Sequence, residues 1–266
     1  MNFINKIIIS LIPFLPKSIV QIFSKKYVAG IDNTQALNVV IKLNKDAQDA
    51  TIDILGEHSS TAKDSKNITN KYIKLLEEIN NKKLNCNLSI KPSHIGADIS
   101  YQLVFENFKE ILKIADTYNN FIRIDMESSK YTDLTIDTFN KFRRDNKSIG
   151  TVFQAYLHRT LNDVKSLDPH NLNFRLCKGI YKENQEIVIK DRNKINDNYI
   201  KILRYAFENN IYVGIATHDT NLLESIYKLI NEMNIEANQF EFKTLFGVPM
   251  HGWNKKHLAN GYKVRV

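Results

Sequence analysis

Short apolar stretches alternate with longer amphipathic stretches along this chain, and this alternation limits its fold more than any other feature of the sequence. The apolar stretches have the length of buried strands, while the amphipathic ones repeat apolar residues at helical spacing, as Val104, Phe108 and Ile111 do. The predicted strands lie at 50–56, 86–90, 121–124, 149–153, 211–216, 240–245 and 262–266, and one more begins at 173. Helices are expected at 34–48, 134–142, 161–167, 199–208, 222–233 and 253–258, and around the apolar residues at 73–79 and 104–115.

Repeated strand–helix units of this kind give parallel strands joined by right-handed crossovers. Eight such strands are the number that closes a (βα)8 barrel. An open, doubly wound sheet is the rival, but it needs a glycine-rich turn after its first strand, and residues 56–59 do not form one. We therefore expect one α/β structural unit, with an N-terminal helical segment over 1–49 and a barrel over 50–266.

Charge, cysteine content and the apolar N-terminal stretch indicate which partners and which cellular compartment to expect. The net charge of +8 is spread over many lysines, without a dense arginine cluster, so we expect no nucleic-acid partner. Cys86 and Cys177 lack metal-type spacing, which favours a reducing, intracellular compartment. The apolar stretch 1–20 is interrupted by Pro13 and Pro16 and is too short to span a membrane. A packed N-terminal helix is expected there, and the alternative is an interfacial helix with a weak contact to a membrane surface.

The stretch 173–183 combines the features of a buried strand with charge. Phe174 and Leu176 are typical of a buried strand, yet Arg175 and Lys178 lie in the same stretch and Gly179 follows at once. A buried cation is costly unless it meets an anion or a polar ligand, and a glycine lets another group approach the backbone. The stretch therefore indicates the floor of a site for a large, electron-rich ligand, and the alternative is a strand edge with solvated cations.

Polar residues follow nearly every predicted strand, at the end where a barrel carries its active groups. A purely structural barrel has no reason to place them all on one rim. Taken singly, each has a structural alternative, such as a helix cap for Asp125 or Thr217 and a satisfied core histidine for His218. The rim residues are Glu57, Lys91, Asp125, Gln154, Arg175, Lys178, Thr217, His218 and Glu241.

Three chemistries could use this rim. A metal-dependent hydrolase favours a His-x-His pair on one strand, which the sequence lacks, so no metal site is expected. A Schiff-base lyase needs a lysine made nucleophilic by burial, and Lys91 and Lys178 stand at suitable positions. A flavin enzyme needs cations and amides around its ring and pyrophosphate, which Arg175, Lys178 and Gln154 could supply.

A series of motifs resembles those of the proline dehydrogenase family, in the same order and at the same spacing. Arg-Leu-x-Lys-Gly-x-Tyr at 175–181 and Ala-Thr-His-Asp at 216–219 are the most specific of them. The others lie at 27–30, 55–57, 123–127, 154–157, 241–247 and 261–266. The resemblance implies a distorted (βα)8 barrel that binds FAD and oxidises L-proline to 1-pyrroline-5-carboxylate by hydride transfer from proline C5 to flavin N5. It also implies a membrane quinone as electron acceptor, and hence a cytoplasmic protein or one peripheral to the inner membrane.

The resemblance also implies roles for individual residues. Lys91 would hold the substrate carboxylate, and Tyr181 and Leu245 would form the apolar wall of the pocket. Asp125 would anchor Lys91 and the pocket, while Arg175 would stabilise negative charge near flavin N5. The residues that would contact the cofactor are Met126, Gln154, Lys178, Gly179, Ile180, Thr217 and His218.

The sequence departs from the family pattern after its eighth strand. Family members continue into a helix that presents two consecutive arginines to the substrate carboxylate, whereas this sequence ends at Val266, before that eighth helix. Arg143 and Arg144 are predicted on an outer helix and do not replace that pair, and one lysine does not replace a bidentate clamp. Two interpretations follow: a proline dehydrogenase whose gene has been cut, or a flavin-binding barrel with impaired catalysis.

Overall fold

The predicted barrel is present in the computed structural model, which describes residues 26–266. Eight strands form one sheet in chain order, and each pairs in parallel with the next. The ring closes between its first and last strands, because Asp49 N donates to Val264 O and Val266 N donates to Asp49 O, both at 2.9 Å. The strands are β1 (Ala50–Asp53), β2 (Cys86–Ile90), β3 (Ile122–Ile124), β4 (Ile149–Gln154), β5 (Asn173–Cys177), β6 (Tyr212–Ala216), β7 (Phe240–Lys243) and β8 (Val264–Arg265).

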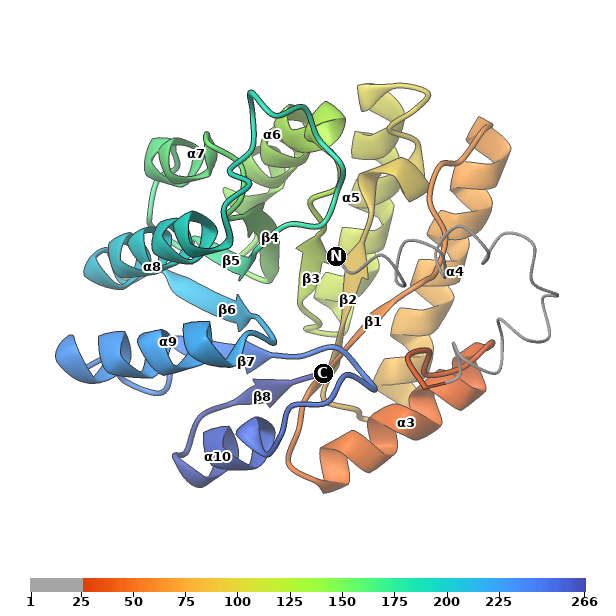
Figure 1. Cartoon of the computed structure of the whole chain (residues 1–266). Helices are drawn as coiled ribbons and strands as arrows, with labels where there is room; N and C mark the ends of the chain where they lie inside the picture. The colour runs from red at the N-terminus through yellow and green to blue at the C-terminus, as the bar shows by residue number, and fades with distance from the viewer. Residues whose placement is uncertain (1–25) are drawn as a thin grey trace, which may run out of the picture.

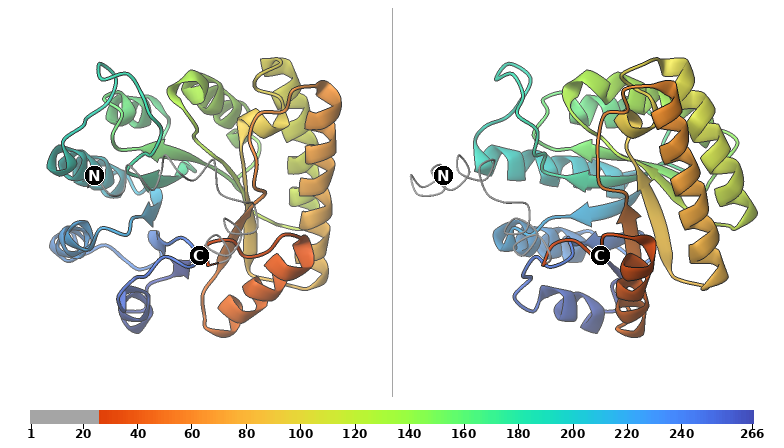
Figure 2. Two further views of the ribbon diagram at one scale, coloured as in Figure 1. Left: turned by 45° about the vertical axis from the view of Figure 1, so that its right-hand side comes forward. Right: turned by 90° about the vertical axis from the view of Figure 1, so that its right-hand side faces the viewer.

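Helices surround the ring of strands on its outer side, as Figure 1 and the two turned views in Figure 2 show. They are α3 (Asn33–Lys45), α4 (Ala62–Asn81), α5 (Tyr101–Thr117), α6 (Thr132–Arg143), α7 (Thr160–Ser166), α8 (Arg192–Glu208), α9 (Thr220–Glu232) and α10 (Trp253–Ala259). Two short 3-10 helices, η2 (Pro92–Ile95) and η3 (Ser129–Tyr131), follow β2 and β3. The helix predicted within 1–20 lies outside the described residues. Between residues 26 and 266, every helix is too short or too polar to cross a membrane.

Side-chain caps explain where several helices begin. Each capping side chain accepts a backbone N–H of the first turn, which would otherwise lack a partner. The capping residues are Asp32, Thr61, Ser100, Asp191 and Asp219. α8 begins at Arg192, earlier than the predicted start at Tyr199, because Asp191 accepts the Lys194 N–H at 2.9 Å. The polar connection after β5 is therefore shorter than predicted.

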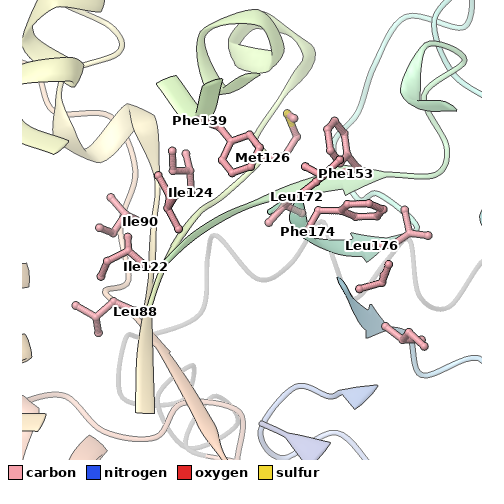
Figure 3. Packing of buried hydrophobic residues seen from close by; sticks show 14 of the residues in the cluster. Leu88, Ile90, Ile122, Ile124, Met126, Phe139, Phe153, Leu172, Phe174 and Leu176 are labelled. Carbon is pink, nitrogen blue, oxygen red and sulfur yellow. The ribbon is translucent and has the colours of Figure 1, made fainter. Parts of the chain in front are cut away.

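The hydrophobic core lies between the ring of strands and the helices. Figure 3 shows part of this layer, with Leu88 and Ile90 of β2 beside Ile122 and Ile124 of β3. These four side chains are at most 1% exposed and belong to one cluster with Phe139 of α6. Because strand side chains alternate between the two faces, the residues between them face the interior of the barrel.

The interior of the barrel is polar. Arg123 of β3 donates to Asn173 Oδ1 of β5 at 3.0 Å, and Lys243 Nζ of β7 lies 3.4 Å from Thr51 Oγ1 of β1. Neither pair of strands is adjacent in the sheet, so both contacts cross the inside of the ring. The sequence pattern of polar residues at alternate strand positions therefore marks a charged interior.

Arg265 joins the last strand to its neighbours on both sides. Its Nε donates to Glu241 Oε2 of β7, its Nη2 to Asp49 Oδ2 and its Nη1 to Ala50 O of β1, each at 2.9 Å. Lys243 Nζ lies 3.5 Å from the other Glu241 oxygen. Burial alone would raise the pKa of Glu241, but these two cations and Arg123 lower it to about 2.

A buried histidine makes the fold sensitive to acid. The His257 ring of α10 is fully buried, stacks on Phe242 with centroids 3.6 Å apart, and places Nδ1 2.9 Å from the Tyr227 hydroxyl oxygen. Burial, together with nearby Lys256, lowers the pKa of His257 from 6.5 to about 4. Above pH 6.5 the His257 ring is neutral in both the folded and the unfolded protein, so it does not change the unfolding free energy. As the pH drops from 6.5 towards 4, the unfolded chain binds the proton more readily, and the unfolding free energy falls.

We therefore expect His257→Gln to flatten the pH dependence of stability. Between pH 7 and pH 5 the unfolding free energy of the unmodified protein is expected to fall by about 2 kcal/mol more than that of the variant. Urea unfolding at a series of pH values measures both slopes. Equal slopes in the two proteins would show that His257 is not held neutral in the folded state.

Candidate active site

Three cations at the carboxyl ends of the strands each meet a carboxylate. The pairs are Lys91–Asp53, Arg175–Asp125 and Lys178–Asp219. Their residues lie in or just after β1, β2, β3, β5 and β6, so the pairs share one end of the barrel. The structure therefore brings Lys91, which follows β2, to the same rim as Arg175 and Lys178 of the β5 stretch.

The Arg175–Asp125 pair reaches across the mouth of the barrel. Asp125 follows β3 and Arg175 lies in β5, so the contact passes over the end of β4. The Asp125 backbone is fixed by its N–H, which donates to Ile90 O at 2.9 Å. The side chains of Arg175 and Asp125 are 22% and 12% exposed. A guanidinium has five N–H donors and Asp125 engages it through Nη2, so Arg175 can also serve a ligand.

Lys91 pairs with Asp53, a residue that sequence reasoning missed. We expected Asp125 to anchor Lys91, but Asp125 contacts Arg175 and Asp53 takes its place beside the lysine. Burial and the nearby charge of Asp125 raise the pKa of Asp53 to about 6, although Lys91 and Arg175 oppose this. Asp53 could have been found from the sequence, because polar residues alternate in β1 and Thr51 and Asp53 both point into the barrel.

Lys178 belongs to a second polar group at the end of β6. Its partner Asp219 also accepts from Asn196 Nδ2 at 3.3 Å and caps α9. Burial opposes ionisation of Asp219, but hydrogen bonds from Lys178, the Leu222 N–H and Asn196 lower its pKa. Thr217 Oγ1 accepts the Asp219 N–H at 3.2 Å, so the predicted Thr217 site residue lies in this group.

Gln154 links the β4 end to the loop that follows β3. Its side chain is buried, and its Nε2 donates to Glu127 O at 2.9 Å. Glu127 is itself 2% exposed, and burial raises its pKa. The amide of Gln154 is therefore held at a fixed angle at the floor of the mouth.

Apolar side chains stand exposed above these polar groups. Ile180 is 90% exposed and Leu245 is 67% exposed, although both are large hydrophobic residues. The Leu245 N–H donates to His218 Nε2 at 2.9 Å, so His218 fixes this loop, and burial lowers the pKa of His218. Tyr181 lies opposite Glu57, with 3.4 Å between its hydroxyl and Oε1. The mouth thus has charged groups below and apolar groups at its edge.

Gly179 lies against an aromatic ring. It has a φ of +106°, and a Cβ added there would lie 2.1 Å from Tyr156 Cδ1. The Tyr156 N–H also donates to Lys178 O at 2.8 Å, which holds the two segments together. A side chain at position 179 would therefore be strained twice, by its backbone angle and by contact with the ring.

Sequence comparison identifies the family. The sequence model described as proline dehydrogenase matches residues 36–266. The chain belongs to the proline dehydrogenase family. It is 34% identical to proline dehydrogenase 2 of Bacillus subtilis (strain 168) over 242 residues, which are 91% of this chain and 79% of that protein. It is 29% identical to the proline dehydrogenase of Deinococcus radiodurans over 248 residues, which are 91% of this chain and 80% of that protein.

Structural comparison supports the same fold for this proline dehydrogenase family member. The proline utilization A protein of Bdellovibrio bacteriovorus superposes with a TM-score of 0.86 at 23% sequence identity. The match covers 94% of this chain and 31% of the larger protein. At this level of identity the likeness concerns the barrel fold alone.

Met126 is the predicted site residue whose side chain points elsewhere. It is 7% exposed and belongs to the hydrophobic core cluster, and Figure 3 shows it close to Phe139 and Phe153. Next to Asp125, its backbone still lies at the rim. The Met126 side chain therefore anchors the loop that carries Asp125 to the hydrophobic core.

We expect Gly179→Ala to damage both stability and ligand binding. Gly252→Ala is the matched control, because Gly252 also has a positive φ, +86°, but nothing lies within 4 Å of an added Cβ. The control is expected to cost about 1 kcal/mol of unfolding free energy, and Gly179→Ala at least about 2 kcal/mol more. Thermal unfolding measures the difference. Equal losses in the two variants would mean that the Tyr156 ring moves away freely.

Proposed function

We propose that this chain oxidises L-proline to 1-pyrroline-5-carboxylate with FAD as cofactor and passes the electrons to a quinone. Membership of the proline dehydrogenase family supports proline oxidation in proline catabolism. The observation that carries the proposal is the Arg175–Asp125 pair, which holds a half-buried guanidinium across the mouth of the barrel. The pair Lys91–Asp53 lies beside it, close enough for Arg175 to affect the pKa of Asp53.

The groups at the mouth fit FAD by their chemistry. Arg175 and Lys178 keep 22% and 26% of their side chains exposed, which suits a negatively charged partner such as a pyrophosphate or a reduced ring. The exposed apolar side chains of Ile180 and Leu245 suit a broad ring system that would cover them. Gly179 presents backbone without a Cβ. FAD, when bound, supplies the acceptor for the hydride that leaves proline.

Further cofactor contacts are proposed on two strands. Gln154 would offer its side-chain carbonyl, since its amide nitrogen already donates to Glu127 O. Thr217 and His218 would lie along the phosphates or the ribityl chain, because both occupy the end of β6 beside Lys178.

The substrate end of the mouth suits a small amino acid with an apolar ring. The Lys91 ammonium would pair with the carboxylate of proline, in competition with Asp53. Tyr181 and Leu245 would contact the apolar carbons of the ring, and both lie on loops at the same end of the barrel. The task of these residues is to orient the ring and to exclude water from it.

The Schiff-base alternative is less well supported. Such a lyase needs a lysine that is free to act as nucleophile, whereas Lys91 and Lys178 each already donate to a carboxylate. Lys243 is buried enough for its pKa to be lowered, but it is 6% exposed and held between Glu241 and Thr51, out of reach of a substrate.

The proposed electron acceptor sets the expected location. A membrane quinone requires at least peripheral contact of the protein with the inner membrane from the cytoplasm. The two cysteines, Cys86 and Cys177, are both free thiols, which agrees with a reducing compartment.

The proposed function is tested with the purified chain and added FAD. We expect a yellow protein that reduces a dye, and then a water-soluble quinone, when L-proline is supplied, with a cyclic imine as product. A protein that stays colourless in excess FAD would refute the cofactor assignment. A yellow protein that ignores L-proline would refute the activity and favour a flavin-binding barrel without turnover, and borohydride trapping of a carbonyl substrate would favour the lyase.

A further inference from the structure

Two glutamates tie three loops of the rim together, and each does so through both carboxylate oxygens. Glu127, after β3, accepts from the Ser93 N–H at 2.8 Å and from Ser93 Oγ at 2.5 Å. Glu183, after β5, accepts from the Ser129 N–H and from Ser129 Oγ, both at 2.6 Å. Hydrogen bonds to an ionised carboxylate are stronger than neutral ones, and two parallel bonds also fix orientation.

The clamped loops are the ones that carry the proposed site. Ser93 follows Lys91 on the loop after β2, and Ser129 lies on the same loop as Asp125. Glu183 is two residues beyond Tyr181 on the loop after β5. The first clamp therefore sets Lys91 relative to Asp125, and the second sets Asp125 relative to Tyr181.

The loop after β5 needs such a clamp. Its Ile180 is 90% exposed and Lys182 is also exposed, so little packing holds this part in place. The far end of the loop is held by backbone contacts, since the His158 N–H donates to Ile187 O at 3.0 Å. Glu183 holds the near end, next to Tyr181.

We propose that Glu183, acting through Ser129, is a positioning residue that fixes Tyr181 as a wall of the substrate pocket. The inference rests on the proposed function, because it takes Tyr181 as a substrate contact. Glu183 itself does not touch the substrate in this scheme. Its two hydrogen bonds keep the β5 loop seated against the β3 loop, so that the pocket is formed before proline enters and no binding energy is used to order the loop.

The first test is a double-mutant cycle read by steady-state kinetics with L-proline. Glu183→Ala and Ser129→Ala are each expected to raise KM about tenfold and to change kcat less than twofold, because a wall contact acts alike on substrate and transition state. The double variant is expected to match the single variants, since both remove one interaction. Glu183→Gln, which keeps an acceptor for the Ser129 N–H, is expected to recover part of the loss.

A matched control removes a glutamate that clamps nothing at the rim. Glu110 pairs with Lys66 on the outer helices α5 and α4, so Glu110→Ala is expected to leave KM unchanged. An unchanged KM in Glu183→Ala, or independent, multiplying effects of Glu183→Ala and Ser129→Ala, would overturn the proposal.

A second readout is independent of the proposed function. Trypsin cleaves after lysine, and Lys182 lies next to Glu183 on the exposed part of the loop. We expect cleavage at Lys182 to be at least fivefold faster in Glu183→Ala and Ser129→Ala than in the unmodified protein or in Glu110→Ala. Equal cleavage rates would show that the clamp does not hold the loop. If the loop loosens but the unmodified protein ignores L-proline, the clamp stands and the proposed function fails.

Discussion

Replacing Arg175 with methionine is expected to lower kcat/KM for L-proline by about 100- to 1,000-fold, the loss seen when one preorganised charge-stabilising donor is removed. Arg175 is the cation held across the mouth of the barrel by Asp125. Without it, charge that develops on the bound ring as proline is oxidised meets no guanidinium, and Asp125 is left at the mouth without its partner. Dye-reduction kinetics over a range of L-proline concentrations measure the loss.

Two comparisons separate this effect from a general loss of charge. Arg175→Lys keeps the charge but not the planar fork of donors, so we expect an intermediate loss. Arg204→Met removes an exposed arginine of α8 that lies 3.8 Å from Glu232, and it is expected to leave kcat/KM unchanged. If Arg175→Met retained more than a tenth of the activity, Arg175 would not be the catalytic cation.

Replacing Arg265 with methionine is expected to lower the unfolding free energy by about 3 to 5 kcal/mol, because it breaks a buried ion pair from one side. Arg265 donates to Glu241, Asp49 and the β1 backbone, and its removal leaves Glu241 buried with Lys243 at 3.5 Å. Two of these hydrogen bonds, to Asp49 and to Ala50 O, also join β8 to the start of β1, so the variant weakens closure of the ring. Urea or thermal unfolding at pH 7 measures the change.

Acid supplies a check on the Arg265 prediction. The pKa of Glu241 in the folded protein, about 2, lies below its ordinary value of 4.5. The ionised Glu241 carboxylate therefore adds to the unfolding free energy above pH 4.5, and this stabilisation is lost as the pH falls towards 2. Arg265→Met is expected to reduce this loss, because Glu241 then has a higher folded pKa. As a control, Lys228→Met removes an exposed pair at 3.8 Å and is expected to cost less than about 1 kcal/mol. If the two substitutions cost the same, the interior pair does not support closure.

The order of the elements could be predicted from the sequence because their hydrophobic periods are local. The strand at 86–90 and the short helix after β7 were predicted within one residue of their observed ends, since the apolar runs and breakers that define them are neighbours in the chain. The start of α8 was placed too late, because the residues that follow its cap Asp191, at 192–194, are all polar and carry no apolar period to mark the first turn.

The choice of partners at the rim could not be predicted in the same way. Lys91 and Asp125 were expected to meet, yet each found another partner, Asp53 and Arg175. Such pairings depend on the tilt and stagger of the closed ring, which decide which strand ends face each other. Met126 shows the same limit, since its neighbour Asp125 faces the mouth while its own side chain enters the core.

A parallel barrel with cations on one rim follows from the amino-acid sequence, because strand period and residue type are local properties. Which carboxylate meets each cation, and the clamp of Glu183 on Ser129 from 54 residues away, became visible only in the folded barrel. The physical reason is that a contact across the ring depends on the relative positions of strands far apart in sequence, and ring closure sets those positions.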